Sequence, residues 1–106
     1  MSILPPLFAA LSDPYRFEII ERLMKDGETP AGAISDMFDI SGPAISRHLS
    51  VLHKAGLVTR RINGQQRLYS VRPEAIREVS DWTMNHRAFW EASMDRLEQA
   101  LLEDKI

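Results

Sequence analysis

One stretch decides the fold of this chain: residues 41–71, with the sequence SGPAISRHLSVLHKAGLVTRRINGQQRLYSV. Its first half predicts a helix, because Ser41 can cap the N-terminus and Pro43 suits the first turn, where a missing N–H costs nothing. From Ile45 onward, apolar residues recur at i, i+4 and i+7 and define the face that packs on a core. Gly56 can end the helix as a residue that tolerates a left-handed backbone.

The second half of the stretch predicts a β-hairpin. Two runs rich in β-branched and aromatic residues, 57–62 and 67–71, flank the polar segment Asn63-Gly64-Gln65-Gln66. An Asn-Gly pair between two such runs is the strongest short-range signal for a hairpin turn. We therefore expect two antiparallel strands whose tip consists of residues 63–66.

Three more helices are predicted upstream of this stretch. Pro5-Pro6 can open a short helix, and Asp13-Pro14 combines a good N-cap with a first-turn proline that opens a second. Thr29-Pro30 repeats this signal for a third helix, which ends at a turn, Asp39-Ile40. Two short helices joined by a tight turn form a helix-turn-helix, and the hairpin that follows would be its wing.

The basic residues are segregated along the sequence. Between Ile40 and Pro73 there is no Asp or Glu, although the whole chain carries 15 acidic and 13 basic residues and a formal net charge of −2. The basic residues inside this window are Arg47, Lys54, Arg60, Arg61, Arg67 and Arg72. A patch of one sign attracts a polyanion. Charge and predicted shape together indicate double-stranded DNA as the partner, which the pI near 5.9 alone would not suggest.

The C-terminal third predicts one long helix, from Pro73 to Ile106, with no breaker. Its apolar residues recur at steps of three and four, and about thirty helical residues span roughly 45 Å, more than so small a domain can cover. An uncovered apolar stripe would be a large exposed patch, so a symmetric homodimer is the economical explanation. The alternative is a helix that folds wholly onto its own domain. The expected dimer interface comprises Leu4, Leu7, Phe8, Trp82, His86, Phe89, Trp90, Met94, Leu97 and Leu101.

Composition places the chain among small globular proteins. Its 106 residues, 44% of them hydrophobic, fit one winged helix-turn-helix domain over residues 1–106, in which 1–12 and 73–106 form the dimer interface. No apolar run approaches the roughly 20 residues that cross a bilayer, and the N-terminus lacks the features of a secretory signal. Cysteine is absent, which excludes disulfides and a thiol nucleophile. We therefore expect a cytoplasmic protein with no membrane partner.

The second helix of the helix-turn-helix carries the candidate base-reading residues, because such a helix enters the major groove by its N-terminal end. Arg47 can bind O6 and N7 of guanine, a contact worth about 1–3 kcal/mol of discrimination, and Ser46 can donate or accept at a base edge. Ser41 and Lys54 are better placed for phosphates. The expected recognition-helix residues are Ser41, Gly42, Pro43, Ser46, Arg47, Ser50 and Lys54.

The wing combines a polar, flexible tip with arginines, which suits contact with the DNA backbone or minor groove. Neighbours on a strand point to opposite faces, so one of Arg60 and Arg61 is expected to face away from DNA and pair with an acid. The sequence does not decide which. His48 is expected to pack or to contact phosphate, not to read a base. The expected wing residues are Arg60, Arg61, Asn63, Gly64, Gln65, Gln66 and Arg67.

Three stretches resemble the ArsR/SmtB family of winged-helix repressors: LSDPYR at 11–16, ISGPAISRHL at 40–49 and LHKAGLV at 52–58. The resemblance runs over nearly the whole chain. It implies a cytoplasmic homodimer that binds an inverted-repeat operator and blocks transcription, with Ser46, Arg47 and their neighbours reading bases. In many members of the family, binding of a metal or another inducer releases the DNA.

The sequence departs from the metal-sensing pattern of that family. Where metal-sensing members carry Cys-x-Cys on the third helix, this chain has Pro30-Ala31-Gly32. The last helix offers Asp81, His86, Glu91 and Asp95, whereas zinc needs about four converging N, O or S ligands. We therefore expect no metal and no cofactor. A small-molecule inducer fits the resemblance, and its chemistry does not follow from the sequence.

Together these features predict a mainly α fold with a small β-hairpin (α+β), in the order α-α-α-α-β-β-α, that acts as a dimeric DNA-binding transcriptional regulator and most simply as a repressor. The alternative is a winged-helix protein-interaction module without specific DNA binding, which would leave the Ser-capped helix without a role. An enzyme is disfavoured, because the sequence has no nucleophile elbow, no evident carboxylate pair and no phosphate-cradling glycine loop.

Overall fold

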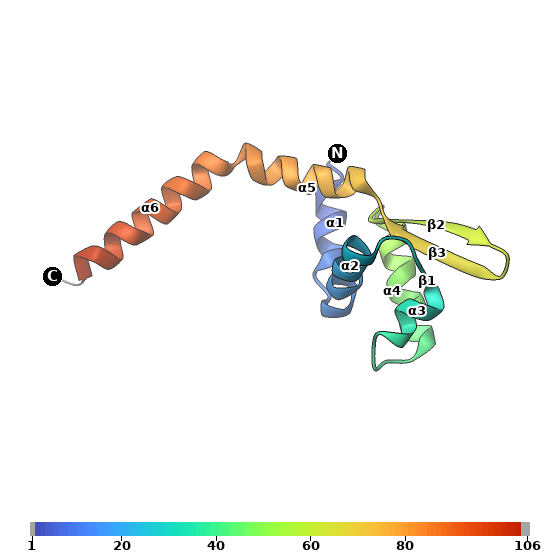
Figure 1. The fold of residues 1–106 in the computed structure, drawn as a ribbon. Helices are drawn as coiled ribbons and strands as arrows, with labels where there is room; N and C mark the ends of the chain where they lie inside the picture. Colours follow the sequence, from blue (N-terminus) through green and yellow to red (C-terminus); the bar gives the residue numbers. More distant parts are fainter. Residues whose placement is uncertain (1, 105–106) are drawn as a thin grey trace. The chain divides into compact units, whose positions relative to one another are not determined.

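The computed structural model describes residues 2–104, and the predicted end of the last helix at Ile106 lies outside these described residues. The described chain is mainly helical with a small antiparallel sheet, which confirms the predicted fold class (Figure 1). The elements are α1 (Leu4–Leu11), α2 (Pro14–Asp26), β1 (Thr29–Pro30), α3 (Ala31–Asp36), α4 (Gly42–Lys54), β2 (Val58–Asn63), β3 (Gln66–Val71), α5 (Pro73–Asn85) and α6 (Arg87–Asp104).

The chain divides into two compact units, an N-terminal unit (Met1–Ile76) and a C-terminal unit (Arg77–Ile106). The N-terminal unit contains the hydrophobic core, to which every one of its helices and the sheet contribute. The largest fully buried side chains are Leu7, Ile19, Ile34, Ile45, Leu49, Leu52, Leu57 and Val58.

None of the helices in residues 2–104 combines the length and the hydropathy that crossing a membrane requires.

The boundaries of α2 and α4 follow from their capping residues, as predicted. The Asp13 carboxylate accepts hydrogen bonds from the backbone N–H groups of Tyr15 and Arg16, at 2.8 and 3.1 Å, and Pro14 occupies the first turn. Ser41 Oγ accepts from the backbone N–H of Ala44 at 3.2 Å. These side chains satisfy N–H groups that a helix start leaves without an intrahelical acceptor.

The C-terminus of α4 is a Schellman motif centred on Gly56. The Gly56 N–H donates to the carbonyl of His53, and the Leu57 N–H donates to the carbonyl of Leu52 at 3.0 Å. Gly56 has φ of 84°, a left-handed conformation that favours glycine. Leu52 and Leu57 are both fully buried, so the motif also brings the chain from α4 into the core before β2 begins.

Thr29-Pro30 was predicted to open the third helix by capping, and this prediction is wrong. The two residues form the short strand β1, in which Thr29 pairs with Tyr69 and Pro30 with Leu68 of β3. The helix α3 begins only at Ala31, and Pro30 precedes it without a side-chain cap. Proline is tolerated here because β1 is an edge strand of a sheet with the order β1-β3-β2.

The predicted hairpin forms, but its tip is shorter than expected. Asn63 and Gln66 pair with each other as the last residues of β2 and β3, which leaves Gly64 and Gln65 as a two-residue turn. Gly64 has φ of 65°, whereas no residue other than glycine in the described chain has a positive φ. Glycine with positive φ at the first central position is typical of a type II′ turn, whose twist suits a hairpin.

The predicted single helix from Pro73 is interrupted at His86, which separates α5 from α6. The normal acceptor for the His86 N–H would be the carbonyl of Trp82, but the His86 side chain donates to that carbonyl from Nδ1, at 2.8 Å. The His86 N–H donates instead to the carbonyl of Thr83 at 3.2 Å. Thr83 in turn donates from Oγ1 to the carbonyl of Val79, a side-chain bond that bends helices. The side chains of Thr83 and His86 thus compete with backbone N–H groups for the carbonyl acceptors of the helix.

Candidate nucleic-acid interface

The outward face of α4 presents the residues that were predicted to contact DNA. Ile45, Leu49 and Leu52 fix the orientation of α4, because all three side chains are buried in the core. Residues at a spacing of three and four share a helix face, so the opposite face is polar and basic. The predicted residues on this face are all exposed: Ser41, Gly42, Pro43, Ser46, Arg47, Ser50 and Lys54.

Small residues surround the start of α4, where a helix end could approach a DNA base or phosphate. Adding a Cβ to Gly42 would meet no other atom within 4 Å, so the surface there is open. Ser41 uses its Oγ as an acceptor for the Ala44 N–H, and its hydroxyl proton is available to another acceptor. Backbone N–H groups at a helix start and the helix dipole both favour an anion at this position.

The wing presents its arginines on two different faces. All predicted wing residues from Arg60 to Arg67 are exposed. In the register of the hairpin Ile62 pairs with Arg67, so Arg67 lies on the same face as Ile62 and therefore as Arg60. Arg61 lies on the opposite face, with its cross-strand partner Leu68. Within residues 2–104, neither Arg60 nor Arg67 has a carboxylate within 4.0 Å.

Arg61 is the member of the Arg60/Arg61 pair that binds an acid. Its Nε and Nη2 atoms donate to the two carboxylate oxygens of Glu28, at 2.9 and 2.8 Å. These hydrogen bonds and the charge of Glu28 raise the pKa of Arg61 above its ordinary value. Glu28 lies outside the acid-free stretch of the sequence, in the turn that precedes β1. The fold therefore places one carboxylate on the basic wing.

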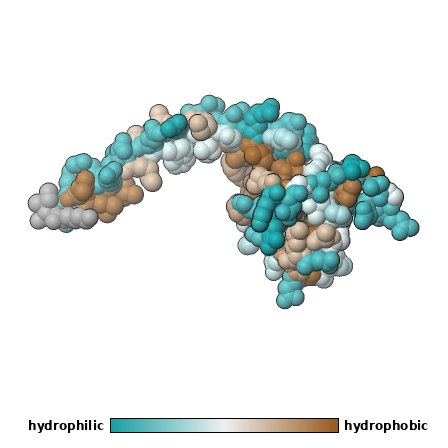
Figure 2. Space-filling view, in the orientation of Figure 1, coloured by the Kyte–Doolittle hydropathy of each residue, from teal (hydrophilic) through white to brown (hydrophobic). Residues whose placement is uncertain are grey.

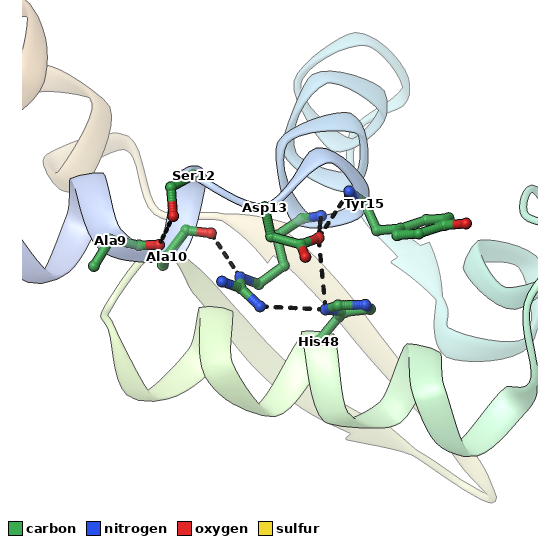
Figure 3. A network of polar contacts seen from close by, with 7 residues as sticks. Ala9, Ala10, Ser12, Asp13, Tyr15 and His48 are labelled. Carbon is green, nitrogen blue, oxygen red and sulfur yellow. Dashed lines mark hydrogen bonds and ion pairs between the residues drawn. The ribbon is translucent and has the colours of Figure 1, made fainter.

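His48 attaches α4 to the start of α2 (Figure 3). Its Nδ1 lies 3.9 Å from the Asp13 carboxylate and 3.4 Å from Nη1 of Arg16. Arg16 also donates from Nε to the carbonyl of Ala10 at 2.6 Å. The ring of Tyr15 stacks on the His48 ring, with centroids 5.7 Å apart. His48 is thus a packing residue, as one of the two predicted alternatives stated, and lies on the side of α4 that contacts α2.

Asp13 is the acidic member of this network, and its pKa lies below the ordinary value. Burial by itself raises the pKa of the carboxyl group, but several interactions outweigh it. They are the hydrogen bonds from the backbone N–H groups of Arg16 and Tyr15, followed by electrostatic interactions with His48 and Arg16. Asp13 is therefore an ionised cap that holds the beginning of α2 and faces α4.

The stretch that replaces the cysteine pair of the metal-sensing members lines an open groove between α3 and the tip of the wing. Its lining residues are Pro30, Ala31, Gly32, Ala33, Asp36, Gln65, Gln66 and Arg67. Asp36 is the one residue in this lining with a carboxylate, thiolate or imidazole side chain. Within residues 2–104 the structure gathers no three His, Cys, Asp or Glu side chains into a group that could hold a metal ion.

One residue of the expected dimer interface is already covered in a single chain. Leu7 is 1% exposed and belongs to the core of the N-terminal unit, so it has almost no surface left for another chain. The periodicity of α1 did not reveal which side of this helix faces the core. Leu4 is half-buried, and the other expected interface residues are exposed: Phe8, Trp82, His86, Phe89, Trp90, Met94, Leu97 and Leu101.

Known proteins resemble this chain in sequence and in fold. A family described as a helix-turn-helix domain matches residues 11–61, from the end of α1 to β2. The transcriptional repressor SdpR of Bacillus subtilis is 37% identical over 79 residues, which are 74% of this chain and 87% of that protein. The chain belongs to the ArsR/SmtB family of winged helix-turn-helix regulators.

Solved structures of ArsR regulators have the same fold. One ArsR family transcriptional regulator superimposes with a TM-score of 0.75 at 26% identity, covering 84% of this chain and 91% of that one. An ArsR-like regulator from Rhodococcus sp. RHA1 gives a TM-score of 0.72 at 27% identity, covering 92% of this chain and 91% of that one. This ArsR/SmtB protein is therefore a DNA-binding transcriptional regulator and not an enzyme.

Sequence reasoning missed the residues that support this site from outside the acid-free stretch. Glu28 was not singled out, because its partner Arg61 lies 33 positions away. Asp13 was recognised as a helix cap, and the contacts of Arg16 and Tyr15 with His48 were not anticipated. Capping motifs are local signals and can be read from the sequence. Contacts between helices depend on how the core packs.

Proposed function

We propose that this ArsR/SmtB protein is a homodimeric repressor that binds an inverted-repeat operator in double-stranded DNA. The observation that carries the proposal is the exposed face of α4, where Arg47 lies between Ser46 and Ser50. Arginine binding to guanine supplies base discrimination, while the basic wing and the N-terminus of α4 supply phosphate contacts. Repression is the mode that the name of the relative SdpR supports.

The second half of the proposal is that unit Arg77–Ile106 pairs with its copy in another chain. None of the side chains of α6 is buried, although apolar residues recur along it as Trp90, Met94, Leu97 and Leu101. The last three are 66%, 56% and 56% exposed. Figure 2 shows apolar side chains, in brown, at the surface of this segment. Steps of four, three and four are the spacing by which two helices pack against each other.

A dimer also explains how two recognition helices would reach one operator. Two-fold symmetry places the α4 helices about one helical turn of DNA apart, roughly 34 Å, so that they read successive major grooves. An inverted repeat has the matching symmetry. We place the protein in the cytoplasm, where its DNA partner lies. A small-molecule inducer would be the signal that releases the protein from DNA.

The test is selection of binding sites from random duplex DNA with the purified protein, followed by titration of the selected site at several salt concentrations. If each bound protein neutralises about six phosphates, log K falls with log salt with a slope of roughly −5. We expect the selected sequences to be inverted repeats. Failure to enrich any sequence, or a slope near zero, would contradict the proposal and favour a protein-interaction module.

Arg47→Ala distinguishes base reading from phosphate contact. The variant should lose about 1–3 kcal/mol of binding to the selected operator, a loss of roughly 5- to 150-fold, and much less of its binding to random DNA. The comparison requires both DNAs in the same buffer. An equal loss on both would make Arg47 a phosphate contact, and Ser46→Ala and Ser50→Ala variants would then test the other two polar positions on this face.

A further inference from the structure

The ion pair between Arg61 and Glu28 removes one arginine from the basic surface that the sequence suggests. Arg61 is 60% exposed at its side chain and lies in the middle of β2, next to Arg60 in the sequence. The guanidinium group of Arg61 donates hydrogen bonds to both carboxylate oxygens of Glu28, at 2.8 and 2.9 Å. This planar two-bond geometry is also the geometry with which arginine binds a phosphate. Carboxylate and phosphate therefore compete for the same donors.

The fold places Glu28 beside Arg61, although the two residues are far apart in the sequence. Glu28 precedes β1, whose Pro30 pairs with Leu68 of β3, and Leu68 pairs with Arg61 of β2. Paired residues of neighbouring strands point to the same face, so Pro30, Leu68 and Arg61 are aligned on one face of the sheet, and Glu28 lies in the turn just before β1. Arg61 reaches across the central strand to Glu28. A phosphate would have to displace a carboxylate that the fold itself keeps in place.

The other two wing arginines are not restrained in this way. Arg60 and Arg67 lie on the opposite face of the hairpin, and no carboxylate of residues 2–104 lies within 4.0 Å of either. The wing thus contains two arginines that can bind phosphate directly and one that is already occupied. Phosphate contacts supply essentially all of the sequence-independent affinity for DNA. Occupying one arginine therefore lowers binding to any sequence, while the base contacts of α4 are unaffected.

We propose that Glu28 withholds Arg61 from DNA phosphate and so lowers the sequence-independent affinity of the protein for DNA. The inference rests on the proposed function. Neither Glu28 nor Arg61 then contacts DNA in the wild-type complex. The wing arginines that bind phosphate are Arg60 and Arg67.

The test compares salt titrations of wild type, E28Q, R61Q, the double variant E28Q/R61Q and R60Q on a fluorescent duplex of random sequence. E28Q should steepen the slope of log K against log salt by about 0.9 per chain, which at 0.1 M salt is up to about eightfold tighter binding per chain. R61Q should leave the wild-type slope unchanged, whereas R60Q should flatten it by about 0.9 per chain. In the double variant the gain from E28Q should disappear.

E18Q is the matched control, because Glu18 forms a similar exposed ion pair with Arg22, at 3.2 Å, on α2. It removes the same charge and should not change the slope. On the selected operator, E28Q should tighten binding by about the same factor as on random DNA, because the added phosphate contact does not depend on sequence. The proposal is overturned if E28Q leaves the slope unchanged, or if R61Q alone flattens it as R60Q does. Absence of DNA binding by the wild type would instead refute the proposed function itself.

Discussion

At the scale of single residues, Asp13 shows how one side chain can serve both a helix and a site. It accepts two backbone hydrogen bonds at the start of α2, at 2.8 and 3.1 Å, and lies 3.9 Å from His48 on α4. The cap was predictable, since Asp before Pro is a local signal. The contact with His48 was not, because it depends on the packing of α2 against α4.

Replacing Asp13 should destabilise the protein in a pH-dependent way. Asp13→Ala removes the cap and should lower the free energy of unfolding at pH 7 by about 0.5–2 kcal/mol. Asp13→Asn keeps a capping oxygen and removes only the charge, so its loss should be smaller. The measurement is urea unfolding of wild type and both variants, followed by circular dichroism.

The sign of the pH effect follows from the lowered pKa of Asp13. A carboxyl group whose pKa is lower in the folded protein stabilises it above its unfolded value, about 3.9, and loses this contribution as pH falls through the folded pKa. The difference in stability between wild type and Asp13→Asn should therefore be largest near neutrality and shrink in acid. A difference that stays constant from pH 7 to about pH 3 would show that the charge of Asp13 does not matter.

At the scale of elements, the helix-turn-helix and the wing are joined by a three-residue turn centred on Gly56. Gly56 has φ of 84° and turns the chain from α4 into β2, and its left-handed backbone provides the two hydrogen bonds of the Schellman motif. The periodicity of the sequence identified α4 and both strands of the hairpin. It did not predict β1, because a two-residue strand has no period and forms only when β3 is beside it.

Gly56→Ala should destabilise the protein by about 1–2 kcal/mol, because an L-residue resists this backbone conformation. No atom lies within 4 Å of the position of the added Cβ, so the cost comes from the backbone and not from a clash. Gly32→Ala is the control: Gly32 lies in α3, its φ is not positive and the space around it is equally open. The stability of the Gly32→Ala variant should equal or slightly exceed that of the wild type, since alanine favours a helix more than glycine does. Equal stabilities of the two variants in urea unfolding would contradict this account.

At the scale of the whole molecule, the exposed apolar residues of α6 are the surface for which we propose a second chain as the partner. The sequence predicted the apolar stripe, and the structure adds that α6 buries none of its side chains within one chain. It also separates Leu7, which is part of the core, from the surface that a second chain would cover. The interruption at His86 divides the stripe between α5 and α6.

Leu97→Glu combined with Leu101→Glu should convert the protein to a monomer at micromolar concentration, as measured by analytical ultracentrifugation. Burying two carboxylates in an apolar interface is unfavourable, whereas both side chains are exposed in a single chain, so the fold should survive. Affinity for an inverted repeat should fall by about 100-fold or more, because the two half-sites are no longer linked. Gln99→Glu adds charge to the same helix between these positions and should remain dimeric. A monomeric wild type would contradict the proposed dimer.

The sequence by itself determined the features that depend on neighbours along the chain: the caps at Asp13 and Ser41, the apolar face of α4, the hairpin around Gly64 and the basic stretch from Ile40 to Pro73. These features can be read from a short window of the sequence, because backbone preference, apolar periodicity and local charge depend only on residues that are close in the chain. Only the tertiary structure decided that Glu28 binds Arg61, that His48 contacts Asp13, and that Thr29 belongs to the sheet. Each of these contacts joins residues far apart in the chain, and packing of the core, not a local preference, brings them within bonding distance.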